Sequence, residues 1–179
     1  MNTPNNKRRR ESREKIEKVF IEMLQNKALD SIKVSEICKK AQINRTTFYS
    51  NYDDIYALAD SIRTGLEAQI GEVYADEISK KYNSNDFEKL FRYIKDNQII
   101  FNTYFKLGFD DNYKIVQFDH KLAEQHFGNK YIEYHCEFFR AAITSIIKMW
   151  LKNGCKESPA EMADIIRQEY RGRIEIVGK

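Results

Sequence analysis

Apolar residues recur along most of the chain at intervals of three and four positions, which is the spacing of one face of an α-helix. Two short helices within 34–50 and a long one from 55 to about 81 are predicted by this spacing. They follow a first helix that is predicted to begin near residue 13, with its apolar stripe at Ile16, Val19, Phe20, Met23 and Leu24.

The second half of the chain continues this periodicity and adds capping signals. Residues 158–161 (Ser-Pro-Ala-Glu) combine a capping Ser, a Pro in the first turn and a Glu that completes a capping box. Asn85 and Glu88 form a similar pair, and Gly108 is placed to end a helix. With about nine helices and no convincing strand, the expected fold class is all-α. The helices predicted here span residues 86–95, 99–107, 113–127, 131–152 and 158–171.

Composition excludes several classes of protein. Seven Gly and two Pro in 179 residues are too few for the many turns of a β-sandwich or barrel. No segment approaches the roughly 20 consecutive apolar residues of a membrane span, and the first residues lack the apolar run of a secretory leader. We therefore expect a cytoplasmic protein that does not enter a membrane.

The sequence also lacks the usual signs of catalysis. There is no phosphate-binding loop, nucleophile elbow or pair of carboxylates in an apolar context. Cys38, Cys136 and Cys155 are scattered, and the three histidines do not have the spacing of metal ligands. We expect no enzyme activity, no cofactor, no metal and no disulfide framework.

Charge is distributed unevenly along the chain. Residues 1–50 carry twelve Lys or Arg against six Asp or Glu, whereas the whole chain has a net charge of only +3. A basic N-terminal segment on a nearly neutral body is typical of a DNA-binding head, because phosphate contacts supply most of the non-specific affinity for DNA. Basic side chains that merely solvate a helix face would give the same totals, so charge alone leaves both interpretations open.

Residues 34–52 have the spacing of a helix-turn-helix, in which the second helix enters the major groove of DNA. Asn44 is placed to cap this second helix. Arg45, Thr46 and Ser50 are predicted to face away from Phe48, where they can reach base edges or phosphates.

The string VSEICKKAQINRTTFYSNY at 34–52 resembles the N-terminal head of TetR-type transcriptional regulators. Heads of that family share a run of the form I-A-x-x-A-G-V-S-x-x-T-hydrophobic-Y-x-H-F. The resemblance implies a DNA-binding domain at 1–53, with a basic arm at 7–13 and a recognition helix at about 44–50. Residues 54–179 would then form the regulatory and dimerisation domain.

The resemblance also implies a function and its contacts. Members are two-fold dimers on near-palindromic double-stranded DNA, usually repressors that a small effector releases. The DNA contacts implied are Arg8, Arg9, Arg10, Ser35, Asn44, Arg45, Thr46, Thr47, Tyr49, Ser50 and Asn51.

Three positions depart from the family pattern. Gln42 stands where the turn Gly is expected, and a non-glycine residue at positive φ costs roughly 1 kcal/mol. Lys33 replaces the hydroxyl residue that would cap the second helix. Ile55 replaces a phosphate-binding Lys and follows Asp53 and Asp54, so no phosphate clamp is expected there.

Aromatic residues are concentrated in the C-terminal part of the chain. Fifteen of the 23 lie between Phe87 and Trp150, either as helical core or as the lining of a cavity for a small effector. An alternative is a coregulator whose C-terminal domain binds a protein partner instead. The candidate lining residues are Phe91, Phe101, Tyr104, Phe105, Phe118 and His120.

The last two predicted helices carry more apolar residues than one core needs. Such a surplus marks a partner surface, and in TetR-like proteins the corresponding helices of two subunits form a four-helix bundle. The predicted dimer residues are Phe138, Phe139, Ala142, Ile146, Trp150, Ile165 and Ile166.

Overall fold

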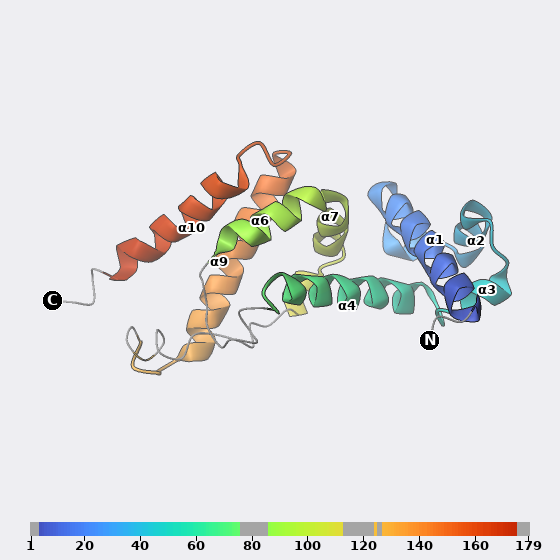
Figure 1. Ribbon diagram of the computed structural model, residues 1–179, viewed down its shortest axis with the longest axis horizontal. Helices are drawn as coiled ribbons and strands as arrows, with labels where there is room; N and C mark the ends of the chain where they lie inside the picture. The colour runs from blue at the N-terminus through green and yellow to red at the C-terminus, as the bar shows by residue number, and fades with distance from the viewer. Residues whose placement is uncertain (1–3, 76–85, 113–123, 125–126, 175–179) are drawn as a thin grey trace. The chain divides into compact units, whose positions relative to one another are not determined.

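A computed structural model describes residues 4–75, 86–112, 124 and 127–174 of the chain. Within these residues the secondary structure consists of eight α-helices and two short 3₁₀ helices, with no strand (Figure 1). The predicted all-α fold is therefore confirmed. The elements are α1 (Pro4–Asn26), η1 (Leu29–Ser31), α2 (Val34–Ala41), α3 (Arg45–Tyr49), α4 (Ile55–Val73), α6 (Phe87–Asp96), α7 (Gln98–Lys106), η2 (Phe109–Asn112), α9 (Ile132–Lys152) and α10 (Pro159–Ile174).

Contacts divide the chain into two compact units, residues 1–68 and 69–179. The first unit holds α1, α2, α3 and most of α4. Its core is built from the predicted apolar stripes, because α1 packs against α2 and α2 against α3. The side chains that are fully buried in this core are Ile16, Phe20, Leu24, Ile37, Phe48 and Leu58.

The turn between α2 and α3 has the geometry that the family pattern requires. Gln42 adopts a left-handed conformation with φ 55° and ψ 46°, and its N–H donates to the carbonyl of Cys38. Asn44 then caps α3, as predicted, with its side-chain oxygen accepting the N–H of Thr47 at 2.7 Å. Gln42 therefore occupies a glycine-type position in spite of its side chain.

The second unit is centred on α6, which packs along α10 (Figure 1). The Phe91 ring of α6 meets the Trp150 ring of α9 edge to face, with 5.4 Å between the ring centroids. Trp150 is buried, and its indole N–H donates to the carbonyl of Glu157 at 3.3 Å. The predicted capping box at the start of α10 is also present, since Ser158 and Glu161 exchange backbone-to-side-chain bonds of 2.7 and 3.2 Å.

Several helix boundaries differ from the predictions. Helix α1 begins at Pro4 instead of near residue 13, because the N-terminal basic residues extend the helix as a solvent-exposed face. Helix α4 ends at Val73. Asp86 caps α6 by accepting the N–H of Glu88, whereas the predicted cap Asn85 lies outside the described residues. The helix predicted over 113–127 also falls almost entirely outside them.

None of the described helices has the length and the apolar character needed to cross a bilayer.

Replacing Gln42 with Gly should stabilise the N-terminal unit. The left-handed backbone costs a residue with a Cβ about 1–2 kcal/mol, and the extra chain entropy that Gly loses on folding offsets part of this gain. We expect a net increase of about 0.5–1 kcal/mol in the free energy of unfolding, measured by urea titration. Gln42→Ala keeps the strain and is the matched control; equal stabilisation by both variants would contradict this account.

Candidate nucleic-acid interface

The outer face of α3 is made of polar side chains held outward by a buried anchor. Phe48 is fully buried, and the edge-to-face contact of its ring with Tyr49 has a centroid separation of 5.5 Å. On the opposite side Arg45 and Thr46 are exposed, and Tyr49 keeps 54% of its surface in contact with solvent. Among the other predicted contacts, Asn44 and Ser50 are exposed, whereas Thr47 and Asn51 are half-buried.

The start of α2 is specified by Glu36. Its carboxylate accepts the backbone N–H of Lys33 at 3.4 Å and also receives the Lys27 ammonium at 3.0 Å. Lys27 holds the pKa of Glu36 below its usual value, with a further contribution from the Lys33 N–H. The Lys33 ammonium has no lone pair and cannot accept a bond from the helix, so this helix start lacks the reciprocal side-chain cap, as the sequence suggested. Ser35 is exposed in the first turn.

The basic segment at the N-terminus belongs to α1. Arg8, Arg9 and Arg10 are exposed on this helix, so the predicted basic arm is helical over these residues. Arg9 reaches the end of α3, with its guanidinium 3.4 Å from both Asn51 Oδ1 and the Ser50 carbonyl oxygen. An open hollow lined by Arg9, Arg10, Arg13, Glu14 and Glu17 lies along this part of α1. Arg9 therefore lies beside the end of α3, and it shares the hollow with the guanidinium groups of Arg10 and Arg13.

The beginning of α4 explains one of the two acidic residues that precede Ile55. Asp54 Oδ1 accepts the backbone N–H groups of Tyr56 and Ala57 at 2.8 and 2.7 Å. These bonds satisfy two donors at the helix start, where a negative charge is also favourable. Ile55 is half-buried. Asp54 therefore starts the helix, and Ile55 carries no positive charge.

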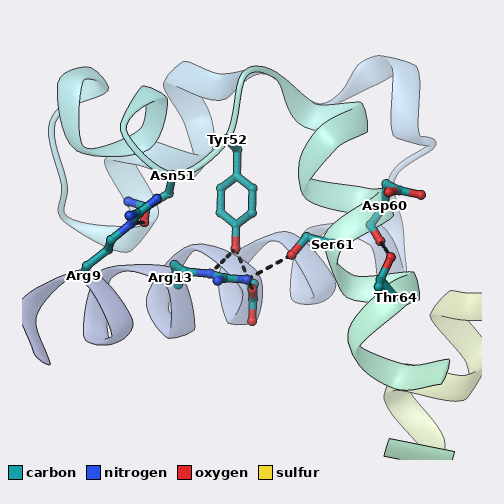
Figure 2. A network of polar contacts seen from close by, with 8 residues as sticks. Arg9, Arg13, Asn51, Tyr52, Asp60, Ser61 and Thr64 are labelled. Atoms are coloured by element: carbon teal, nitrogen blue, oxygen red, sulfur yellow. Dashed lines mark hydrogen bonds and ion pairs between the residues drawn. The ribbon is translucent and has the colours of Figure 1, made fainter. Parts of the chain in front are cut away.

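A polar network that the sequence did not predict joins three segments of the first unit (Figure 2). The Tyr52 hydroxyl donates to Glu17 Oε1 at 2.5 Å and accepts from Arg13 Nε at 3.3 Å. The Nη2 of Arg13 donates to Ser61 Oγ on α4 at 3.1 Å. The network thus joins α1 to Tyr52, in the segment between α3 and α4, and to Ser61 on α4.

Burial governs the chemistry of this network. Tyr52 keeps only 6% of its surface exposed, and its burial and the adjacent Glu17 carboxylate raise the pKa of the phenol to about 12. The protonated hydroxyl is therefore the form that the fold favours. The sequence did contain a signal, because Arg13 and Glu17 lie one helical turn apart on α1.

The predicted effector-lining residues form part of an aromatic layer in the second unit. Phe91, Phe101 and Tyr104 are buried, and Phe105 is half-buried. Phe101 packs against Tyr93 and Phe105, with ring centroids 5.9 and 6.5 Å apart. Phe118 and His120 lie outside the described residues.

Only some of the residues predicted to form the dimer surface are exposed in the single chain. Phe138 and Ile165 are 54% and 41% exposed, and Ala142 is also exposed. Phe139 and Ile146 are half-buried. Trp150 and Ile166 are only 1% and 3% exposed because they belong to the core of their own unit, so they offer little surface to a partner.

Comparisons with known proteins show what this chain is similar to. Residues 83–171 match the family model TetR_C_8, described as a transcriptional regulator C-terminal region. The HTH-type dhaKLM operon transcriptional activator DhaS of Lactococcus lactis subsp. lactis (strain IL1403) is 26% identical over 146 residues, which cover 74% of this chain and 75% of that protein. The C-terminal region of the chain therefore matches a family of TetR-type transcriptional regulators, and the chain is similar to an HTH-type regulator over 146 residues.

A solved structure has a similar fold. It is titled Dihydroxyacetone kinase operon activator DhaS, and the two chains share 21% identity with a TM-score of 0.55. The match covers 92% of this chain and 97% of that chain. This likeness concerns the fold alone.

Replacing Tyr52 with Phe tests the network. At neutral pH the loss of the hydroxyl should lower the free energy of unfolding by about 1–2 kcal/mol, because Glu17 and Arg13 lose a buried partner. In the wild type the contribution should be full below pH 10 and lost as the pH rises towards 12, since the folded state favours the protonated phenol. Urea unfolding at pH 8 and pH 11 measures both effects.

Tyr49→Phe, on the exposed face of α3, is the matched control and should change stability by less than about 0.5 kcal/mol. The interpretation fails if Tyr52→Phe loses as much stability between these two pH values as the wild type does.

Proposed function

We propose that this chain is a TetR-type regulator and a homodimer that reads a near-palindromic site on double-stranded DNA with α3. The observation that carries the proposal is the anchoring of α3: Phe48 is buried, while Arg45 and Thr46 face solvent. A helix fixed in this way presents its polar side to the major groove without rearrangement of the head. Two heads related by a two-fold axis would read two half-sites.

Phosphate contacts are assigned to α1. Arg8, Arg9 and Arg10 are exposed on the same unit as α3, and Arg9 already lies beside the α3 end. The start of α4 is excluded from this role because Asp54 caps it and Ile55 carries no charge. In this proposal the arginines of α1 replace the missing lysine, with Ser35 at the first turn of α2 as a further backbone contact.

The dimer is assigned to α9 and α10. Exposed apolar side chains follow one face of α9: Tyr134, Phe138 and Ala142 are about one turn apart, and Met149 lies two turns further on. Ile165 is exposed on α10. Such a stripe is unfavourable in water, and a second copy of these helices would cover it.

The C-terminal unit is proposed to control DNA binding through a small effector. Two directions of control are open to a TetR-type dimer, and the resemblance at 34–52 implies repression. The Lactococcus relative, however, is named an operon activator, and its role favours activation for the present chain. A reporter gene behind the selected site distinguishes them, because deletion of the regulator lowers expression under activation and raises it under repression.

Sequence preference should depend on Thr46. Selection from a random DNA pool should yield a near-palindrome, and Thr46→Ala should weaken binding to it about 5- to 150-fold, because a good base contact contributes about 1–3 kcal/mol. Binding to random DNA should be unchanged. Thr64→Ala on α4, whose hydroxyl bonds to the Asp60 carbonyl, is the control. Equal loss on both DNAs would show that Thr46 contacts a phosphate.

Dimerisation should depend on Phe138. Phe138→Glu places a charge on the exposed stripe of α9 and should shift the protein to a monomer in sedimentation equilibrium at micromolar concentration. Ile99→Glu makes the same kind of change at another exposed position, on α7, and should leave the dimer intact. A dimer that survives Phe138→Glu would remove this face from the interface.

A further inference from the structure

Asp110, in η2, is a buried carboxylate with only one of its two oxygens paired. The residue keeps 4% of its surface exposed. Its Oδ2 accepts a 2.6 Å bond from the Lys148 ammonium of α9, and its backbone carbonyl accepts one of 2.9 Å from Arg140. Its Oδ1 is also buried, but no described residue donates to it.

A buried carboxylate oxygen without a hydrogen-bond donor is unusual and destabilises a fold. Buried polar atoms nearly always have a hydrogen-bond partner, and an unsatisfied one destabilises the fold because its hydration is lost without replacement. The nearby cations do not supply the bond. Arg140 directs its Nε and Nη2 at Glu137 and its Nη1 at the Asp110 carbonyl, and Lys148 is placed on Oδ2.

The surroundings of this carboxylate are aromatic. The Tyr104 ring lies 5.7 Å from that of Phe109 and 5.6 Å from that of Phe105, measured between centroids. Lys148 Nζ also lies 5.3 Å from the centre of the Phe105 ring. Tyr104 and Phe105 are two of the residues that the sequence predicted to line an effector site, so the unpaired oxygen and the predicted lining meet at η2.

We propose that Oδ1 of Asp110 accepts a hydrogen bond from a hydroxyl group of the effector, whose apolar body packs against Tyr104, Phe105 and Phe109. A neutral donor fits better than a second cation, because Lys148 already neutralises the carboxylate and would repel another positive charge. This inference rests on the proposed effector control and names the class of effector, a small apolar alcohol.

Two compounds that differ only at the polar group test the proposal. 1-Phenylethanol donates a hydrogen bond, whereas acetophenone has the same carbon skeleton and only accepts. Calorimetric titration of the full-length protein should show at least about tenfold tighter binding of the alcohol, since a hydrogen bond to a charged group contributes about 1.5–3 kcal/mol.

Asp110→Asn should reverse or abolish this preference. The Lys148 ammonium can only donate, so it selects the amide oxygen and leaves the amide NH₂ at the place of Oδ1, where it offers a bond to the ketone. Lys148→Met keeps both carboxylate oxygens and should preserve the preference for the alcohol. This second variant separates loss of the acceptor from loss of the ion pair.

Three results would overturn the proposal: equal affinities in the wild type, an unchanged preference in Asp110→Asn, or no binding of either compound up to its solubility limit. Binding to the selected DNA is measured in parallel. If the alcohol binds with the expected preference but leaves DNA binding unchanged, the effector control under the proposed function fails while the Asp110 site stands.

Discussion

Burial of Phe48 is the constraint on which the polar outer face of α3 depends. Helix α3 has only five residues, too few to be stable alone, and its orientation comes from this one ring in the core of the N-terminal unit. The left-handed turn at Gln42 brings the ring to that core from α2, and the Asn44 cap fixes where the helix starts. Once the ring is buried, the helical geometry directs Arg45 and Thr46, on the opposite side of α3, towards solvent.

Local signals in the sequence predicted the parts of this structure that depend on a few neighbouring residues. The Asn44 cap and the capping box of Ser158 and Glu161 are determined within four positions, and both are present. The exposure of Arg45 and Thr46 followed from the helical spacing around Phe48. These contacts are short in sequence, so periodicity and residue type contain nearly all the information they need.

Features that join distant segments could not be read in the same way. Trp150 was assigned to a partner surface because it lies on an apolar face of α9, but Phe91, far away in sequence, covers its ring. The Tyr52 network depends on Glu17 and Ser61, which lie 35 positions before and 9 after it in the chain. Asp110 gave no sequence signal, since a Gly-Phe-Asp-Asp-Asn stretch usually belongs to an exposed turn.

The contact between Arg9 and the end of α3 has a consequence for recognition. Both hydrogen bonds of the Arg9 guanidinium are long, 3.4 Å. They already restrict the rotamers of Arg9, so the side chain loses less conformational entropy when it binds a ligand. An anion arriving beside Ser50 exchanges two weak partners for a strong one, with the guanidinium already ordered nearby. Preorganisation of this kind lowers the entropic penalty of association, so a head with few cations at its α4 end can still hold a polyanion firmly.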